Sequence, residues 1–437
     1  MKKISSFFGL IACSVLFSQS FNKAKMDEFM NVLDENQKMM GTIAVAKDSK
    51  IVYSKSIGFA DVENKIKNSL ETKFRIGSVS KIFTAVLVMK AVEEGQLKLD
   101  DKISKFYPEI KNSEKITIEN LLNHRSGIHN VTDLPDYLSW NQDYKTPAQI
   151  IEKIKEGGSD FEPGAEMSYS NSGYILLSYI LEKVYKKPFS KILEEKIVKP
   201  LSLKNTYYGG KIDVKKGEAN SYEISENFKK QEETDPSIPS GAGALVSNAE
   251  DLLKFIHNLF GNKVISANSL AQMTKMTDNY GYGIFAVPFH DLKGFGHTGG
   301  IDGFTSEVFY FPTSKLAYVR LSNGVNYDTN TLGIAALSAA TGKDFEIPNF
   351  KTVAVSEADL KKLEGTYATS AFPLKINVFV KDGKLFGQAT GQGEFPLEAK
   401  SSTKFEFTMA GIEMEFVPEK KEMNFSQMGN KMVFTKE

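Results

Sequence analysis

The sequence contains a single cysteine, Cys13, which lies within the first twenty of its 437 residues. A disulfide requires two cysteines, so neither disulfide bonds nor thiol chemistry is expected of the folded protein. An excess of charge of one sign is also missing, because 54 Lys and Arg residues balance 54 Asp and Glu residues. With a formal net charge of zero and no long basic block, the sequence gives no sign of a surface that binds nucleic acid.

Histidine is scarce as well, with five residues in the chain. His124, His129, His257 and His290 are scattered without the spacing that a metal site requires. We interpret these four as structural or surface residues and expect neither a metal ion nor another cofactor. The fifth, His297, stands in a glycine-rich motif of its own.

The N-terminus is the one segment that does not read as part of the folded protein. Lys2 and Lys3 precede an apolar stretch at residues 4–17 that is too short to span a membrane, and small residues follow at Ser18 and Ser20. This order is typical of a secretory signal peptide covering residues 1–20, so we expect a periplasmic or secreted protein without a transmembrane helix. An alternative is that residues 10–13 form a lipoprotein processing box, which would leave a lipid anchor on Cys13.

Strand-like runs open and close residues 21–345, and mainly helical sequence lies between them. Residues 41–46 and 51–58 flank Asp48-Ser49-Lys50 and predict an antiparallel hairpin. The pattern predicts an α+β fold in which one antiparallel sheet, built from both ends of this region, is flanked by helices and joined by a mostly helical subdomain. Further strands are expected at 281–287, 294–300, 305–311 and 315–322. Helices are expected at 23–38, 116–124, 174–185 and 332–340, with a capping box at Ser247 to Glu250.

The sequence changes character after residue 345. Residues 346–355 include Pro348 and predict a linker, and a short helix is expected at 356–363. The rest alternates polar and apolar residues at period two, for example at 375–380 and 404–408, which predicts a small all-β domain at 356–437, a sandwich or a barrel. This segment contains no histidine and no catalytic constellation.

Ser78-Val79-Ser80-Lys81 precedes the apolar run 82–89. As a helix, that run would be buried on all sides, with Ser78 at its start and Lys81 one turn further along the same face. A buried lysine loses hydration, which lowers its pKa and lets it accept a proton, so Ser78 is a candidate nucleophile. The alternative is that Ser78 only caps the helix. Two other pairs, Ser20 with Lys23 and Ser401 with Lys404, have the same spacing but open no buried apolar helix.

Tyr169-Ser170-Asn171 lies in a predicted loop at the entrance of a helix. A tyrosine can act as a general base if a cationic neighbour such as Lys81 stabilises its deprotonated hydroxyl. Asn171 can offer both a donor and an acceptor to a substrate amide. The alternative is a buried tyrosine bonded to a loop carbonyl, with Asn171 as a turn residue.

Gly296-His297-Thr298-Gly299-Gly300 ends a predicted strand. Glycines at this place let a substrate approach the backbone closely, and the N–H group of Gly300 could donate to an oxyanion. The alternative is a tight β-turn that carries a surface histidine.

Taken in order, Ser78-Val79-Ser80-Lys81, Tyr169-Ser170-Asn171 and His297-Thr298-Gly299 resemble the motifs of the serine β-lactamase and penicillin-recognising peptidase superfamily. The tyrosine in the second motif is similar to the class C branch. The resemblance covers about residues 25–345 and implies a β-lactamase/transpeptidase-like fold. The last part of the chain resembles the lipocalin-like β domain that follows some of these proteins.

The resemblance implies a role for each motif. Ser78 would attack a carbonyl and become acylated, while Lys81 and Tyr169 share the proton transfers as a coupled pair. The backbone N–H groups of Ser78 and Gly300 would form the oxyanion hole. The residues implied to bind the substrate are Asn171, His297, Thr298 and Gly299.

The sequence departs from the efficient β-lactamases of this branch at His297, where those enzymes carry a lysine. Histidine is mostly neutral at pH 7, which weakens the binding of a substrate carboxylate. We therefore expect a serine hydrolase that acts through an acyl-enzyme on a peptide, amide or ester bond, as a D-amino-acid peptidase, carboxypeptidase or esterase. Its substrate would be a small molecule or a peptide, such as one derived from peptidoglycan. The alternatives are a class C-like β-lactamase and, in another class, a non-catalytic protein that binds peptidoglycan or penicillin.

Overall fold

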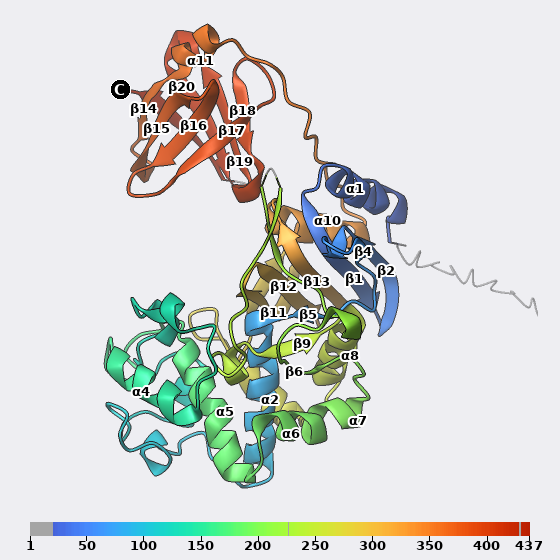
Figure 1. Ribbon diagram of the computed structural model, residues 1–437, viewed down its shortest axis with the longest axis vertical. Helices are drawn as coiled ribbons and strands as arrows, with labels where there is room; N and C mark the ends of the chain where they lie inside the picture. Colours follow the sequence, from blue (N-terminus) through green and yellow to red (C-terminus); the bar gives the residue numbers. More distant parts are fainter. Residues whose placement is uncertain (1–20, 226, 428–429) are drawn as a thin grey trace, which may run out of the picture.

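The computed structural model of the protein describes residues 21–225, 227–427 and 430–437. Three regions follow one another along the molecule: a closed eight-stranded barrel at one end, a six-stranded sheet in the middle and a group of helices at the other end (Figure 1). The predicted α+β fold with an additional all-β region is therefore confirmed. The predicted signal peptide, with Cys13, lies outside the described residues.

The six-stranded antiparallel sheet has the order β10-β11-β12-β13-β1-β2. β1 (Met39–Lys47) and β2 (Lys50–Ile57) form the predicted hairpin, and the turn residues Asp48 and Ser49 have positive φ angles of 49° and 64°, as a two-residue hairpin turn requires. β1 also pairs with β13 (Leu316–Val325), so strands from both ends of the region meet in one sheet, as predicted. The other strands of this sheet are β10 (Phe285–Phe289), β11 (Leu292–Ile301) and β12 (Phe304–Phe311).

Both faces of this sheet are covered. α1 (Lys23–Glu35) and α10 (Thr329–Thr341) share a core with Ile43 and Val45 on one face. α8 (Ala249–Phe260) packs on the opposite face, toward which Ala44 and Ala46 point. Because successive strand residues point to opposite faces, burial of both faces explains the apolar run of β1 from Ile43 to Ala46.

The helical region lies at the far side of the sheet from the barrel (Figure 1). Its helices are α2 (Ser80–Glu93), α3 (Ile118–Leu122), α4 (Pro147–Gly157), α5 (Asn171–Tyr185), α6 (Phe189–Leu193), α7 (Lys199–Leu201) and α9 (Ala267–Met273). Short strands pair as β3 (Phe59–Asp61) with β4 (Ile66–Lys67), as β7 (Tyr222–Ile224) with β8 (Phe228–Lys230), and as a three-stranded sheet of β5 (Phe74–Arg75), β9 (Leu245–Ser247) and β6 (Tyr207–Tyr208).

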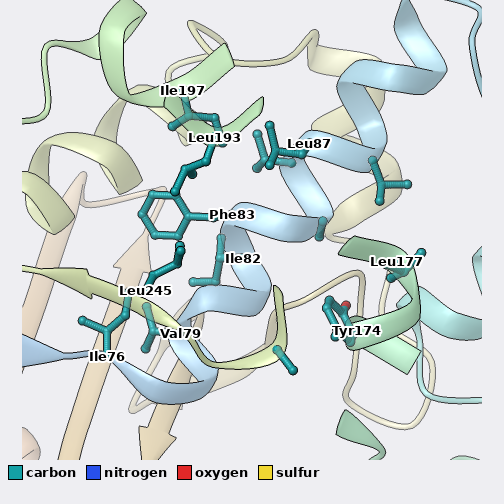
Figure 2. Close-up of a cluster of buried hydrophobic side chains, with 14 of the residues drawn as sticks. Ile76, Val79, Ile82, Phe83, Leu87, Tyr174, Leu177, Leu193, Ile197 and Leu245 are labelled. Carbon is teal, nitrogen blue, oxygen red and sulfur yellow. The ribbon is translucent and has the colours of Figure 1, made fainter. Parts of the chain in front are cut away.

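α2 is the helix that we predicted to be buried on every side. All of its residues from Ser80 to Met89 are buried. Phe83 stacks on Phe255 of α8 with 3.8 Å between the ring centroids, and Figure 2 shows the Phe83 ring next to Leu193 and Leu245. Packing on all sides fixes the position of α2, and with it the residues at its N-terminus.

One predicted strand begins later than its sequence pattern indicated. The strand expected at 281–287 starts only at Phe285, because the residues before it form a turn. Gly283 has a φ angle of +68°, and the amide of Gly281 donates to the carbonyl of Ile284 at 2.8 Å. The alternation of tyrosine and glycine at 280–283 is therefore not the alternation of a strand.

Two helix starts also differ from prediction. Asn248 caps α8 by accepting the amide of Asp251, while Ser247 ends β9, so the predicted capping box does not form. α5 begins at Asn171, which therefore belongs to the helix and not to the loop before it.

The barrel follows α11 (Glu357–Leu363) and closes where β14 (Gly365–Thr369) pairs with β21 (Asn430–Lys436). Tyr367, Phe405 and Phe416 are among the large side chains that fill its interior, as expected for a barrel of eight strands. The remaining strands are β15 (Phe372–Lys381), β16 (Lys384–Ala389), β17 (Glu394–Ala399), β18 (Lys404–Phe407), β19 (Ile412–Val417) and β20 (Glu422–Gln427).

Residues 346–355 contain no helix or strand and connect α10, which covers the six-stranded sheet, to α11 and the barrel. The amide of Val353 donates to the carbonyl of Ala399, and Lys38 approaches Glu398 at 3.3 Å, so both the linker and the sheet region contact the barrel. The exact domain boundaries stay a prediction. Over the described part of the chain, no helix combines the length and apolar character needed to cross a membrane.

Candidate active site

Ser78 lies at the junction between β5 and α2. The chain passes from β5 through a single 3-10 turn, Gly77–Val79, and α2 begins at Ser80. Ser78 thus stands in the turn just before the buried helix, as the sequence indicated. It lines a cleft of about 670 Å³ that also has Asn171 and Gly300 in its wall.

Lys81 is completely buried directly beneath Ser78. Its Nζ lies 2.9 Å from Ser78 Oγ, 2.8 Å from Asn171 Oδ1 and 2.8 Å from the carbonyl oxygen of Ala242. Burial lowers the pKa of Lys81 well below 10.5, which favours the neutral amine. The predicted effect of burial on this lysine is therefore present in the structure.

The contacts of Lys81 Nζ indicate whether an N–H group or the lone pair of the neutral amine faces Ser78. A neutral amine has two N–H groups and one lone pair, and the oxygens of Asn171 and Ala242 can only accept. These two oxygens take the two N–H groups, so the lone pair is left for the Ser78 hydroxyl proton.

Asn171 is held by protein groups on every side of its amide. Its Nδ2 donates to Asn130 Oδ1 and to Thr132 Oγ1, both at 3.2 Å, which leaves Oδ1 to accept from Lys81. The backbone amide of Asn171 also donates to Asn130 Oδ1. Asn171 therefore has a fixed orientation next to Ser78, and Asn130 and Thr132 are supporting residues that the sequence analysis did not identify.

Tyr169 lies in the loop before α5, with 36% of its side chain exposed. Lys81 Nζ is 4.9 Å from the centroid of the Tyr169 ring. Burial of the Tyr169 hydroxyl raises its pKa, and a hydrogen bond with the Ser78 side chain offsets only part of this rise. The tyrosine therefore keeps its proton at neutral pH while it lies close to both Ser78 and Lys81.

β11 brings its glycines against the turn that carries Ser78. A Cβ built on Gly77, whose φ angle is +47°, would lie 2.9 Å from the Gly300 nitrogen, and a Cβ built on Gly299 would lie 3.0 Å from the Ser78 nitrogen. The backbone of residues 77–78 thus runs directly alongside Gly299 and Gly300. This proximity is compatible with the predicted oxyanion hole of the Ser78 and Gly300 amides, which stays a prediction.

His297 lies in the middle of β11 and is buried, so the alternative of a turn with a surface histidine is wrong. Its Nδ1 contacts the Thr298 carbonyl, and its Nε2 is 2.5 Å from the Tyr280 hydroxyl. Nδ1 therefore carries the proton, and the Tyr280 hydroxyl donates to Nε2. Burial, assisted by the nearby Lys81, lowers the pKa of His297 to about 3, so the ring is neutral.

Only Gly300 of this motif lines the cleft. Thr298 is exposed beside it, and the substrate contacts expected of Thr298 and Gly299 stay a prediction. Tyr280, which contacts His297, was not predicted, because it lies just before the strand expected at 281–287 and belongs to none of the three motifs.

Arg75 joins three segments around the cleft. Its guanidinium donates to Asp302 at 3.0 Å, to Glu233 at 2.8 Å and to the carbonyl of Thr234 at 2.7 Å. Arg75 is three residues before Ser78, and Asp302 is two residues after Gly300. The ion pair of Arg75 and Asp302 therefore ties together the two chain segments that contain Ser78 and Gly300.

The other histidines have different surroundings. His129 contacts Asp160 at 2.9 Å near the surface, and His257 is buried in α8, whereas His124 lies in the site, stacked against Tyr169. Over residues 21–437 without the gaps at 226 and 428–429, no group of His, Cys, Asp or Glu side chains is arranged to hold a metal ion.

Comparison with known proteins identifies the family of the chain. A family model described as Beta-lactamase matches residues 25–341, which is most of the chain. The chain belongs to the Beta-lactamase family. As a member of this family it is a serine hydrolase.

Relatives of this Beta-lactamase family member include penicillin-binding protein 4* of Bacillus subtilis (strain 168), which is 26% identical over 90% of this chain and 94% of its own. The teichoic acid D-alanine hydrolase of Staphylococcus aureus (strain NCTC 8325 / PS 47) is 29% identical over 65% of this chain and 69% of its own. Among solved structures, the octameric penicillin-binding protein homologue from Pyrococcus abyssi has a TM-score of 0.68 at 26% identity and covers 94% of this chain and 99% of its own. A D-stereospecific amidohydrolase from Streptomyces sp. has a TM-score of 0.61 at 25% identity over 69% of this chain and 94% of its own.

The approach of β11 to Ser78 can be tested with two alanine substitutions. In Gly299→Ala the new methyl group would overlap the Ile76 carbonyl oxygen, whereas in Gly300→Ala its nearest neighbour is the Phe304 oxygen at 4.0 Å. We expect Gly299→Ala to lower the free energy of unfolding by about 1–3 kcal/mol, as overpacking does. Gly300→Ala should unfold close to the wild-type temperature. Equal thermal stability of the two variants would contradict the described packing.

The pKa of Lys81 predicts how stability depends on pH. Between its lowered pKa and 10.5, the unfolded chain binds one more proton at this residue than the folded chain does. The free energy of unfolding should therefore rise with pH in this window by about 1.4 kcal/mol per unit relative to Lys81→Met, which lacks this titration. Urea unfolding of both proteins from pH 7 to 10 measures the difference. Parallel curves would show that Lys81 is buried with its proton.

Proposed function

We propose that this protein hydrolyses amide or ester bonds of D-amino-acid derivatives through an acyl-enzyme on Ser78. The observation that carries the proposal is the pair of Ser78 and Lys81, with 2.9 Å between Oγ and Nζ. The lowered pKa of Lys81 favours the neutral amine, whose lone pair can accept the hydroxyl proton. A nucleophile within hydrogen-bond reach of a base that is itself oriented by other groups is the arrangement of covalent catalysis.

In the first step Ser78 Oγ attacks the substrate carbonyl carbon, and its proton passes to Lys81 Nζ. The negative charge that develops on the carbonyl oxygen is stabilised by the N–H groups of Ser78 and Gly300. One such donor is worth about 2.7–4 kcal/mol in the transition state. The tetrahedral intermediate then collapses to the acyl-enzyme and releases an amine or an alcohol.

Tyr169 is suited to the second proton transfer. Its raised pKa keeps the phenol protonated, so it can donate to the leaving amine or alcohol and recover a proton from Lys81. In deacylation the same two groups remove a proton from water and return it to Ser78. Lys81 and Tyr169 thus act as one coupled pair and not as separate acid and base.

Two observations support D-amino-acid amides, peptides or esters as the substrate class. Relatives of this chain include a teichoic acid D-alanine hydrolase and a D-stereospecific amidohydrolase. In addition, His297 is neutral and buried at the position where the class C branch carries a lysine, so no cation there holds a β-lactam carboxylate. A carboxypeptidase or an esterase fits this proposal better than a β-lactamase.

Loss of the nucleophile should abolish turnover. We expect Ser78→Ala to lower kcat by up to about a millionfold on a D-alanyl amide or ester, as the loss of one member of a catalytic unit can do. The chain offers a matched control in Ser401, which has the same spacing to Lys404 but lies in a turn next to the barrel strand β18. Ser401→Ala should keep the wild-type kcat. Substantial turnover by purified Ser78→Ala would contradict the mechanism.

Incubation with a penicillin distinguishes the related activities. We expect the intact mass to show a persistent adduct on Ser78, because an acyl-enzyme forms but no cation at position 297 orients it for rapid hydrolysis. Consumption of the antibiotic without an adduct would instead indicate a β-lactamase.

The mass before incubation also tests our proposal that the protein is exported, because it shows whether residues 1–20 are removed or Cys13 carries a lipid.

A further inference from the structure

His124 lies directly behind Tyr169 in the active site. It follows α3, and only 1% of its surface is exposed. Its ring stacks on the Tyr169 ring with 4.4 Å between centroids and an interplanar angle of 30°. The Tyr280 ring also packs against His124, with 4.7 Å between centroids and an interplanar angle of 77°. One face of the Tyr169 ring is therefore supported by an imidazole ring.

The same histidine also holds the backbone on both sides of Tyr169. The amide of Ser168 donates to the His124 carbonyl at 3.0 Å, and the amide of Ser170 donates to His124 Nδ1 at 3.1 Å. One residue thus fixes the segment 168–170 at three points: the ring of Tyr169 and the amides before and after it.

His124 does this in a costly conformation. Its φ angle is +58°, in the left-handed region that residues with a Cβ occupy only rarely. Strained residues persist where the surrounding structure requires them, and they are concentrated at functional sites. In this conformation His124 accepts two hydrogen bonds from the same neighbouring segment, one at its carbonyl oxygen and one at its ring nitrogen Nδ1.

The charge state of His124 suits a place next to Lys81. Because Nδ1 accepts the Ser170 amide, the ring proton is on Nε2, and this buried atom has no hydrogen-bond partner among the described residues. Burial, together with Lys81 and His297, lowers the pKa of His124 well below 6.5. A neutral ring supports Tyr169 without adding a positive charge that would repel a proton on Lys81.

We propose that His124 is a positioning residue for Tyr169, and that it holds the phenol beside Ser78 and Lys81 by stacking on the ring and anchoring the two adjacent amides. This inference rests on the proposed function, because it assigns His124 a role through the proton transfers of Tyr169. It does not require a particular substrate.

A double-mutant cycle tests this role. In His124→Asn the amide oxygen can still accept from Ser170, and asparagine tolerates the left-handed conformation, so mainly the stacked ring is lost. We expect kcat to fall about tenfold with KM changed less than about twofold, since proton transfer and not binding is impaired. In a Tyr169→Phe background the same substitution should lower kcat by less than about twofold more, because the group that it positions is already absent.

A matched control separates positioning from general damage to the fold. His257 is also buried, with 8% exposure, but it lies in α8 and bonds through Nδ1 to the Leu253 carbonyl. His257→Asn should keep the wild-type kcat per active site, with active sites counted by covalent titration of Ser78 with a phosphonate. His124→Phe provides a second variant that keeps a stacking ring and loses the acceptor, and it should lie between His124→Asn and wild type in kcat.

Three results would overturn the inference: an unchanged kcat in His124→Asn, an increase in KM alone, or an equal loss of kcat in the wild-type and Tyr169→Phe backgrounds. If the His124 variants bind no phosphonate while His257→Asn does, the residue is needed for the fold and the positioning role is rejected. Failure of the proposed function is distinguishable, because it would appear as turnover in Ser78→Ala whatever residue stands at position 124.

Discussion

The burial of one amine determines how the rest of the catalytic region is packed. Lys81 is fully buried, and its Nζ contacts Ser78, Asn171 and the Ala242 carbonyl, which belong to three distant segments of the chain. An amine in the interior costs free energy unless such partners are in place, so α2, α5 and the turn at 240–242 must meet at fixed distances. A glycine makes this possible, because a Cβ on Gly241 would come within 2.6 Å of the Ser178 side chain.

Burial of the neighbouring side chains accounts for the uncharged surroundings of Ser78. His124 and His297 are both held neutral, and Tyr169 keeps its proton. Arg75, which is charged, is turned toward Asp302 and Glu233. The resting site therefore has little charge next to Ser78, and in the proposed mechanism full charges arise only when the oxyanion and the protonated lysine form. In an interior of low polarity, preorganised N–H groups act strongly on exactly this developing charge.

The sequence predicted candidate catalytic groups, which the structure brings together, but it did not predict the groups that hold them. Ser78 and Lys81 could be proposed because of their short spacing and because the apolar run of α2 showed that Lys81 would be buried, and Tyr169 could be proposed from its place before a predicted helix. His124 and Tyr280 could not be found in this way. Their roles arise from contacts between segments 46 and 17 residues apart, and a residue type does not report which segments meet.

Glycine shows why local patterns could not decide the remaining cases. Gly283 stands in a real turn with a φ angle of +68°, yet its alternating context indicated a strand. Gly299 stands in a strand, yet its context also fitted a turn with a surface histidine. In β11 the glycine is required because residues 76–78 approach it too closely for a Cβ, and this approach places the Ser78 amide beside Gly300. The same residue type thus serves two opposite backbone conformations, and only the long-range partner distinguishes them.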